Sequence, residues 1–299
     1  MTATRNSTAL IAGCGYVGLR IARLWTHLGI CTYAITRSNE KAAMLRADGI
    51  HPIVTDLSSS NELANLPDAD VVLWSVGFDR SAGVTRESAW IDGLRKLLAA
   101  LPERSTPRRI LYTSSTSVYG DGHGGEVDED TAPNPGSEGG QSCVTAENIL
   151  RDFATRTGTL VTILRLSGIY GPDRLLRRIC ELRDGVPLTT EPDEWLNLVH
   201  VDDAVSVIDA VSRCKQPPAL MNVVAAGSVT RRTYYSILAR LVKAPPPVFE
   251  TADAAPLTRH RRGGNRRVIS LVRLSPPIAF QFDDCESGLR NAIERSRGL

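Results

Sequence analysis

The sequence predicts an α/β fold, with a doubly wound parallel sheet and a small second domain. Three observations favour this fold. Short apolar runs alternate with amphipathic stretches through the first half of the chain, a glycine-rich turn follows the first run, and the pattern becomes irregular after Arg165. The chain has 299 residues, more than the usual single domain, and its 42% apolar content is ample for a core.

The expected strands are the apolar runs 8–12, 32–35, 52–54, 71–76, 109–113 and 160–165. Between them, apolar residues recur at helical spacing, as in 91–101. Residues 119–138 are rich in Gly, Asp and Pro, which predicts an exposed loop and a wall of a substrate site. Residues 199–211 should return to the sheet, 221–225 should add a strand, and 228–241 should form a helix capped by Ser228.

Charge and cysteine usage exclude several classes of function. Lys and Arg total 35 against 33 acidic residues, so the net charge of +2 gives no reason to expect nucleic acid or an anionic membrane as a partner. The six cysteines form no C-x-x-C pair, which favours reduced thiols over disulfides or a metal site. No apolar segment is long enough to span a bilayer. We therefore expect a cytoplasmic protein that binds a small molecule.

The glycine-rich turn Gly13 to Gly18 predicts a dinucleotide site. Gly13 suits a tight turn, Gly15 lets backbone amides approach a pyrophosphate, and Gly18 lets the next helix pack on the strand; Tyr16 and Val17 complete the turn. The amino end of that helix attracts phosphate. The alternative is a chance glycine cluster, but the strand before it and the helix after it favour the binding site.

The end of the second strand predicts which dinucleotide is bound. An NAD site usually has an acidic residue there, whereas this chain has Thr36, Arg37 and Ser38. A guanidinium can clamp the 2′-phosphate of NADP, so we prefer NADP over NAD. The alternative is that Arg37 is a solvated side chain at a strand end.

Three further motifs, 113–120, 165–172 and 200–203, follow the glycine turn in an order that resembles the extended branch of the short-chain dehydrogenase/reductase family. That branch contains nucleotide-sugar epimerases and dehydratases with a Rossmann fold and a substrate cap. The resemblance implies a dinucleotide domain at 1–166 and 197–226 and a cap at 167–196 and 227–299. Asp56 and Leu57 would contact adenine, Ser75, Val76, Gly77, Thr113 and Ser114 would contact the rest of the cofactor, Thr116 would contact substrate, and Ser115 would bind the reacting oxygen. The alternative for these hydroxyls is local backbone hydrogen bonding.

The family's Tyr-x-x-x-Lys pair is missing. With Pro133, Pro135 and Ala146 in register, Gly139 falls on the tyrosine and Cys143 on the lysine. The chain is therefore closest to the atypical members of the family, which lack this pair. General acid–base assistance is worth about 10²–10⁴ in rate, so its loss weakens a redox enzyme without excluding it.

Four residues are candidates to replace the missing acid: Tyr119, Tyr170, Glu138 and His200. Each has a structural alternative, such as packing for the tyrosines and a core position for His200. Cys143 is either an activated thiol or, as we prefer, a small buried residue.

Anion binding is a separate hypothesis. The amides of Gly139 and Gly140 would be open to a substrate phosphate or carboxylate. The basic run 259–267, with Arg174, Arg177 and Arg178, would hold a diphosphate, although runs of like charge are more often solvated.

The sequence thus favours an NADP- or NAD-dependent oxidoreductase or epimerase/dehydratase acting by hydride transfer on a sugar-like or nucleotide-linked substrate. The alternatives are a catalytically inactive dinucleotide sensor and, third, a non-redox lyase or isomerase. A homodimer through the helices near 91–101 and 145–153 is possible in this family, but a helix that covers a sheet shows the same apolar face.

Overall fold

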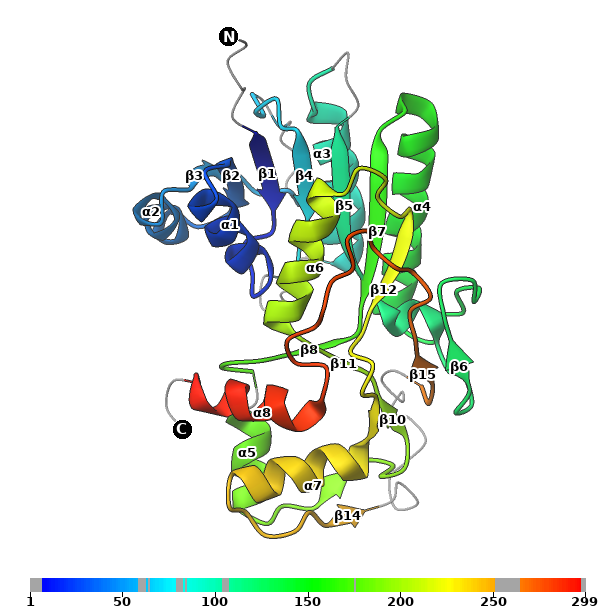
Figure 1. The fold of residues 1–299 in the computed structure, drawn as a ribbon. Coiled ribbons are helices and arrows are strands. Elements are labelled where there is room, and N and C mark those ends of the chain that lie inside the picture. The colour runs from blue at the N-terminus through cyan, green and yellow to red at the C-terminus, as the bar shows by residue number, and fades with distance from the viewer. Residues whose placement is uncertain are drawn as a thin grey trace. The chain divides into compact units, whose positions relative to one another are not determined.

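The computed structural model describes residues 7–58, 63, 65–78, 83, 85–103, 108–174, 176–250 and 264–296. Its centre is a seven-stranded sheet of order β12-β7-β5-β4-β1-β2-β3 (Figure 1). The strands are β1 (Thr8–Ala12), β2 (Cys31–Thr36), β3 (His51–Val54), β4 (Val71–Trp74), β5 (Arg109–Ser115), β7 (Leu160–Leu166) and β12 (Leu220–Val223). β1 pairs in parallel with β2 on one side and with β4 on the other. The strand order along the sheet therefore reverses direction at β1. The predicted doubly wound parallel sheet is confirmed.

Helices cover both faces of this sheet. They are α1 (Gly18–His27), α2 (Asn39–Ala47), α3 (Gly93–Ala100), preceded by a π-helical turn η2 (Glu87–Asp92), α4 (Glu138–Thr157) and α6 (Val201–Arg213). Figure 1 shows α1 and α6 on one face and α3 and α4 on the other. The indole of Trp25 in α1 donates a hydrogen bond to Asp209 in α6 at 3.1 Å.

The core of the sheet forms because the strands are apolar on both faces and the helices turn an apolar stripe toward them. Leu10, Trp74 and Ile110 of the strands belong to one buried cluster with Leu94 and Leu97 of α3. These side chains are at most 1% exposed. Burial of this kind stabilises the fold by about 1.5–3 kcal/mol for each large apolar side chain.

The chain divides into two compact units. The first comprises Met1–Ser114, Gln141–Leu164 and Val207–Met221, and the second comprises Ser115–Gly140, Arg165–Ser206 and Asn222–Leu299. The sequence assigned the loop 115–140 to the dinucleotide domain, whereas its packing assigns it to the second unit. The physical reason is a long-range pairing: β6 (Glu126–Val127) in this loop forms a parallel pair with β15 (Arg267–Val268) near the end of the chain.

The second unit is built from short elements around its own core. Its helices are η3 (Thr116–Tyr119, a 3₁₀ turn), α5 (Leu176–Arg183), α7 (Arg231–Leu241) and α8 (Cys285–Glu294). Its other strands are β8 (Gly168–Tyr170), β9 (Leu188–Thr189), β10 (Trp195–Leu196), β11 (Leu198–His200), β13 (Val229–Thr230) and β14 (Phe249–Glu250). Ile179 of α5, Leu238 of α7 and Leu289 of α8 meet in a cluster that is fully buried.

The structure corrects the boundaries of several predicted elements, including one helix and one strand. The helix expected from Ser228 begins at Arg231, and the cap is Thr230, whose hydroxyl accepts a hydrogen bond from the Thr233 amide. The chain stays extended to Thr230 because β13 pairs with β10, a contact distant in sequence. The fourth strand ends at Trp74 rather than Val76.

All six cysteines are free thiols, and Cys14 and Cys143 are buried. Within the described ranges, no helix combines the length and the apolar character needed to cross a bilayer. Among the same residues, no group of His, Cys, Asp and Glu side chains is arranged to hold a metal ion.

Candidate functional site: a glycine-lined cavity and the end of β5

The turn between β1 and α1 requires glycine at two positions. Gly13 has φ of 94°, and a Cβ there would collide with the carbonyl oxygen of Ser75, just after β4. A Cβ on Gly18 would collide with the Gly13 carbonyl oxygen. Gly15 differs from both, because a Cβ there would meet no protein atom within 4 Å. The turn is therefore tightly packed on the sheet while Gly15 faces open space.

That open space is a cavity of about 410 Å³ within the first unit. It lies at the carboxyl ends of β1, β2, β3 and β4, where the strand order reverses, which is the usual ligand position in an open α/β sheet. The cavity brings together many residues that the sequence singled out: Gly13, Gly15, Thr36, Arg37, Ser38, Asp56, Leu57, Val76 and Gly77. Sequence reasoning missed Lys41, Phe78 and Ala89, which also line it.

The charges in the cavity are unevenly placed. Arg37 and Lys41 contribute cations near the end of β2, while Asp56 follows β3. Asp56 accepts hydrogen bonds from the Ser58 amide at 2.9 Å and the Ser58 hydroxyl at 2.6 Å. These bonds, helped by the charge of Arg37, lower the pKa of Asp56, so its carboxylate is ionised at neutral pH.

Cys14 lies between the two glycines and is also part of the cavity wall. Burial raises the pKa of its thiol to about 11, against a smaller lowering effect of Lys41. The thiol is therefore protonated at neutral pH and is a poor nucleophile.

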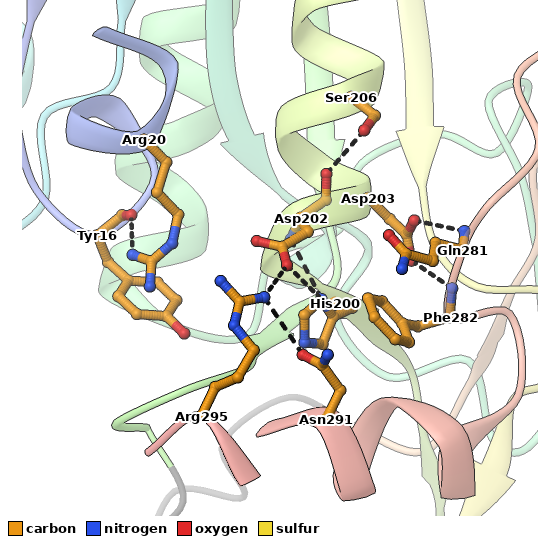
Figure 2. A network of polar contacts seen from close by, with 10 residues as sticks. All are labelled: Tyr16, Arg20, His200, Asp202, Asp203, Ser206, Gln281, Phe282, Asn291 and Arg295. Carbon is orange, nitrogen blue, oxygen red and sulfur yellow. Dashed lines mark hydrogen bonds and ion pairs between the residues drawn. The ribbon is translucent and has the colours of Figure 1, made fainter. Parts of the chain in front are cut away.

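Tyr16 of the turn is held by a neighbour that sequence reasoning did not single out. The guanidinium of Arg20 lies 4.0 Å from the centre of the Tyr16 ring and donates a hydrogen bond to the Tyr16 carbonyl at 2.7 Å (Figure 2). The spacing of four residues places the two side chains on one face at the start of α1, which is the signal that would have revealed the pair.

The hydroxyls near the end of β5 have partners inside the first unit. Ser114 donates to the carboxylate of Glu147 in α4 at 2.7 Å, and Thr113 donates to the Trp74 carbonyl at 3.3 Å. Glu147 is wholly buried, and its other oxygen accepts from Arg151 at 3.0 Å. The hydroxyls of Thr113 and Ser114, which were predicted to contact the cofactor, thus already donate hydrogen bonds within the protein.

Cys143, the residue expected at the family's lysine position, lies in α4. It is 5% exposed and hydrogen-bonds to the phenol of Tyr112, whose pKa burial raises well above its usual value. Cys143 begins the second turn of α4, beyond the amino-terminal amides that would activate a thiol. The geometry agrees with a small buried residue.

Ser115 is the first residue of the second unit. Its hydroxyl oxygen accepts a hydrogen bond from the Ser117 amide at 3.1 Å and so caps η3. This bond fixes the oxygen while the hydroxyl proton can still be donated. Thr116 beside it is buried, and its carbonyl accepts from Arg266 at 2.7 Å.

The described part of the basic run is used within the protein. Arg266 is 4% exposed and donates to the carbonyls of Thr116 and Gly120, and burial lowers the pKa of its guanidinium. Arg267 pairs with Glu126 at 2.6 Å. Arg259 to Gly263 lie outside the described residues, as does the side chain of Arg177. For Arg266, therefore, the diphosphate hypothesis is wrong: it fastens the loop that follows β5.

The two candidate tyrosines are buried in the second unit. Tyr119 donates to Asn222 at 2.8 Å, and the Arg165 guanidinium lies 4.8 Å from the centre of its ring. The phenol of Tyr170 packs against Gly288 of α8, where a Cβ would collide with it. Burial raises the pKa of both phenols, so neither is tuned toward neutral pH.

Figure 2 shows His200 of the second unit beside the ring of Phe282. It is fully buried between Tyr170 and Phe282, with ring centres 5.2 and 4.1 Å away, and its Nδ1 accepts from the Asp202 amide at 3.2 Å. The next acidic residue, Asp203, accepts from the amides of Gln281 and Phe282. Residues 200–203 therefore hold Gln281 and Phe282 in place, which agrees with the structural alternative for His200.

The structure gives less support than expected for anion binding at the residues predicted for it. Gly139 and Gly140 lie in the first turn of α4, and the Gly140 amide donates to the Ser137 hydroxyl at 3.1 Å. A Cβ on Gly140 would lie 2.7 Å from the Ser117 carbonyl oxygen, which accounts for glycine there by packing. Arg174 and Glu138 are exposed.

Comparison with known proteins decides the family. The model of the NAD dependent epimerase/dehydratase family matches residues 9–223. The chain belongs to the NAD-dependent epimerase/dehydratase family. This confirms the resemblance inferred from the motifs.

Relatives of this family member extend over nearly the whole chain. Protein YeeZ of Escherichia coli K12 is 28% identical over 279 residues, which cover 91% of this chain and 94% of YeeZ. A functionally unknown conserved protein from Silicibacter pomeroyi has a TM-score of 0.74 at 25% identity, covering 97% of this chain and 99% of its own. MoeE5 in complex with UDP-glucuronic acid and NAD has a TM-score of 0.76 at 22% identity, covering 97% and 98%. The epimerase/dehydratase fold therefore includes both units of the chain.

Proposed function

We propose that this chain binds NADP or NAD and transfers a hydride to and from a carbinol carbon of a sugar-like, nucleotide-linked substrate. The observation that carries the proposal is the cavity at the glycine turn, with Gly15 open to it and Arg37 and Asp56 in its walls. Membership of the epimerase/dehydratase family and the UDP-glucuronic acid bound by the similar MoeE5 support the substrate class.

The residues of the first unit fit a nicotinamide dinucleotide. Gly15 leaves room for a pyrophosphate, and the amino end of α1 supplies amides and positive partial charge to it. Asp56 and Leu57 would contact the adenosine end, and Val76 and Gly77 the path toward the nicotinamide. When bound, the nicotinamide accepts and returns the hydride. Tyr16, Val17, Gly18 and Ser75 would support this site by shaping the turn.

Ser115 would bind the reacting oxygen of the substrate. Its own oxygen is held by the Ser117 amide, so the hydroxyl is oriented before substrate arrives. The proton donor would not be a Tyr-x-x-x-Lys pair, because Gly139 and Cys143 occupy those positions. Tyr119, Tyr170 and His200 are weak substitutes because they are buried and packed, whereas the exposed Glu138 keeps a carboxylate next to the vacant position.

The test combines binding with product analysis. Calorimetry should detect binding of NADPH or NADH, and incubation with a panel of UDP- and dTDP-sugars should give an isomerised, dehydrated, oxidised or reduced product, detected by chromatography. Ser115→Ala should lower turnover by about 10²-fold or more. Ser117→Ala is the matched control, because it keeps the amide that holds Ser115 and should retain turnover. Absence of binding by either dinucleotide at millimolar concentration would refute the proposal.

The second candidate function is a dinucleotide sensor without catalysis. It is favoured by Cys143, which is buried and hydrogen-bonded to Tyr112 at the position expected for the family's lysine. Tight dinucleotide binding with no product from any sugar in the panel would support the sensor over the enzyme.

A further inference from the structure

We propose that Arg266, which is distant from Ser115 in the sequence, is a positioning residue that holds Ser115 in the orientation needed to bind the reacting oxygen. The inference rests on the proposed function, because it assumes that Ser115 contacts the substrate. Both residues belong to the second unit. The Arg266 side chain is 4% exposed, so it acts through the backbone of η3 and does not itself touch substrate.

Arg266 binds both ends of the short helix that Ser115 caps. Its guanidinium donates one hydrogen bond to the Thr116 carbonyl at 2.7 Å and another to the Gly120 carbonyl. Thr116 is the first residue of η3, and Gly120 follows its last residue. Ser115, at the N-cap, accepts a hydrogen bond from the Ser117 amide with its hydroxyl oxygen. Because η3 is fixed at both ends, the backbone that directs the Ser115 side chain has little freedom to move.

The backbone of Arg266 is itself held on two sides. On one side, β15 pairs with β6 (Figure 1), and the Arg267 amide donates to the Gly125 carbonyl at 2.9 Å. On the other side, the Asn197 side chain donates to the Arg266 carbonyl at 2.8 Å and accepts from the Val268 amide at 2.7 Å. Successive residues of an extended chain point to opposite faces, so Arg266 is buried while the side chain of Arg267 is 39% exposed. The guanidinium of Arg266 is therefore held in a fixed position relative to η3.

The two carbonyls account for a charged side chain at this buried place. Within the ranges that the structure describes, Arg266 forms no ion pair with a carboxylate, and its Nε has no hydrogen-bond partner. Burial is the main influence on the pKa of Arg266 and lowers it, while the charge of Asp121 opposes this effect. A guanidinium stays protonated in proteins, and hydrogen bonds from a charged donor are roughly twice as strong as neutral ones. The contacts with Thr116 and Gly120 are therefore the interactions that offset the burial of the charge.

Kinetics of single and double variants, with a UDP- or dTDP-sugar that the wild type converts, test the inference. Arg266→Met should lower kcat by about 10- to 100-fold, because a misplacement of about 1 Å can cost about 10²-fold in rate. KM should change less than about threefold, because Arg266 does not touch substrate. In a Ser115→Ala background, Arg266→Met should lower the residual kcat by less than about twofold, because the residue that it positions is already gone. Equal losses in the two backgrounds would overturn the inference, since Arg266 would then act independently of Ser115.

Arg273→Met is the matched control. Arg273 follows β15 and also donates to backbone carbonyls, those of Ser270 and Val272, but its side chain is exposed. This variant should keep the wild-type kcat. Arg266→Lys keeps a charged donor without the guanidinium fork, so its kcat should lie between those of Arg266→Met and the wild type.

Hydrogen–deuterium exchange, measured by mass spectrometry on peptides that contain residues 115–120, tests the same contacts without substrate. Both Arg266 variants should speed exchange in this segment by about tenfold or more, whereas Arg273→Met should not. Arg266→Lys carries both measurements if Arg266→Met does not fold. Wild-type kcat and wild-type exchange in Arg266→Lys would show that η3 does not need the fork, and would overturn the inference.

Failure of this inference and failure of the proposed function give different results. Additive losses of kcat, or unchanged exchange in 115–120, overturn the role of Arg266 while an active wild type leaves the proposed function standing. A wild type that converts no nucleotide sugar overturns the proposed function, and this inference with it.

Discussion

Glu147→Ala should destabilise the first unit more than the loss of an exposed glutamate from a helix would. The carboxylate is wholly buried, accepts from Ser114 at 2.7 Å and from Arg151 at 3.0 Å. A hydrogen bond to a charged group contributes about 1.5–3 kcal/mol, and truncation leaves the buried Ser114 hydroxyl without its acceptor. The Arg151 side chain is 43% exposed, so its ion pair adds only about 0.2–1 kcal/mol after screening by solvent. We therefore expect a loss of about 2–4 kcal/mol in the free energy of unfolding.

Urea unfolding followed by tryptophan fluorescence measures this loss, provided that the slope of free energy against urea stays constant. Arg151→Met is the matched control and should cost less than about 1 kcal/mol, because it removes only the exposed partner. Glu147→Gln keeps an acceptor for Ser114 and should fall between the two. A loss below about 0.5 kcal/mol for Glu147→Ala, or an equal loss for Arg151→Met, would refute the assignment of the stabilising contact to Ser114 and Glu147.

Three further predictions follow from local geometry. Gly15→Ala should keep the wild-type free energy of unfolding but weaken dinucleotide binding, whereas Gly18→Ala should lower both, since only Gly18 faces a backbone oxygen; equal stability of the two variants in urea would contradict this. Asp284 caps α8 by accepting hydrogen bonds from the amides of Glu286 and Ser287. Hydrogen bonds from Ser287 lower the pKa of Asp284 in the folded state. The cap contributes about 1 kcal/mol, which is present above the unfolded pKa of about 3.9 and is lost as pH falls through the lower folded value. Asp284→Ala should therefore be less stable than wild type at pH 7 and approach it in acid, and a difference that stays constant with pH would exclude the carboxylate as its cause. Burial raises the pKa of Cys14 to about 11, so iodoacetamide at about pH 8 should label the exposed Cys180 and spare Cys14 in the native protein, as peptide mass spectrometry would show; equally fast labelling of both would contradict this.

The strands were predictable because burial on both faces requires continuous apolar runs. The seven-stranded sheet contains all seven expected strands, and β1 matches its predicted range. The ends were harder to predict where polar residues continue a strand. β5 extends through Ser114 and Ser115, which look like a strand end in sequence, because Ser114 finds a buried acceptor in Glu147.

Glycine positions in the site were predictable for a local reason. Glycine is required at positions 13 and 18 by contacts within one strand–turn–helix unit and its neighbouring strand. The spacing in the sequence is therefore enough to predict both glycines. The fate of the candidate acids depended on partners far along the chain. Tyr119 binds Asn222, and His200 packs against Phe282, contacts that no local pattern contains.

The glycine turn and the positions predicted for the Tyr-x-x-x-Lys pair are held by separate contacts. The turn is specified by contacts with the backbone just after β4, whereas Cys143 hydrogen-bonds to Tyr112 of β5, where its small side chain is buried. A lysine at position 143 would bring an ammonium into a buried environment, and the carboxylate one helical turn away, Glu147, already binds Ser114 and Arg151. Under the predicted register, a cysteine there needs no compensating charge. Under the proposed function, proton transfer then depends on groups outside the buried face of α4. The proton path would start at the Ser115 hydroxyl, which the Ser117 amide already orients.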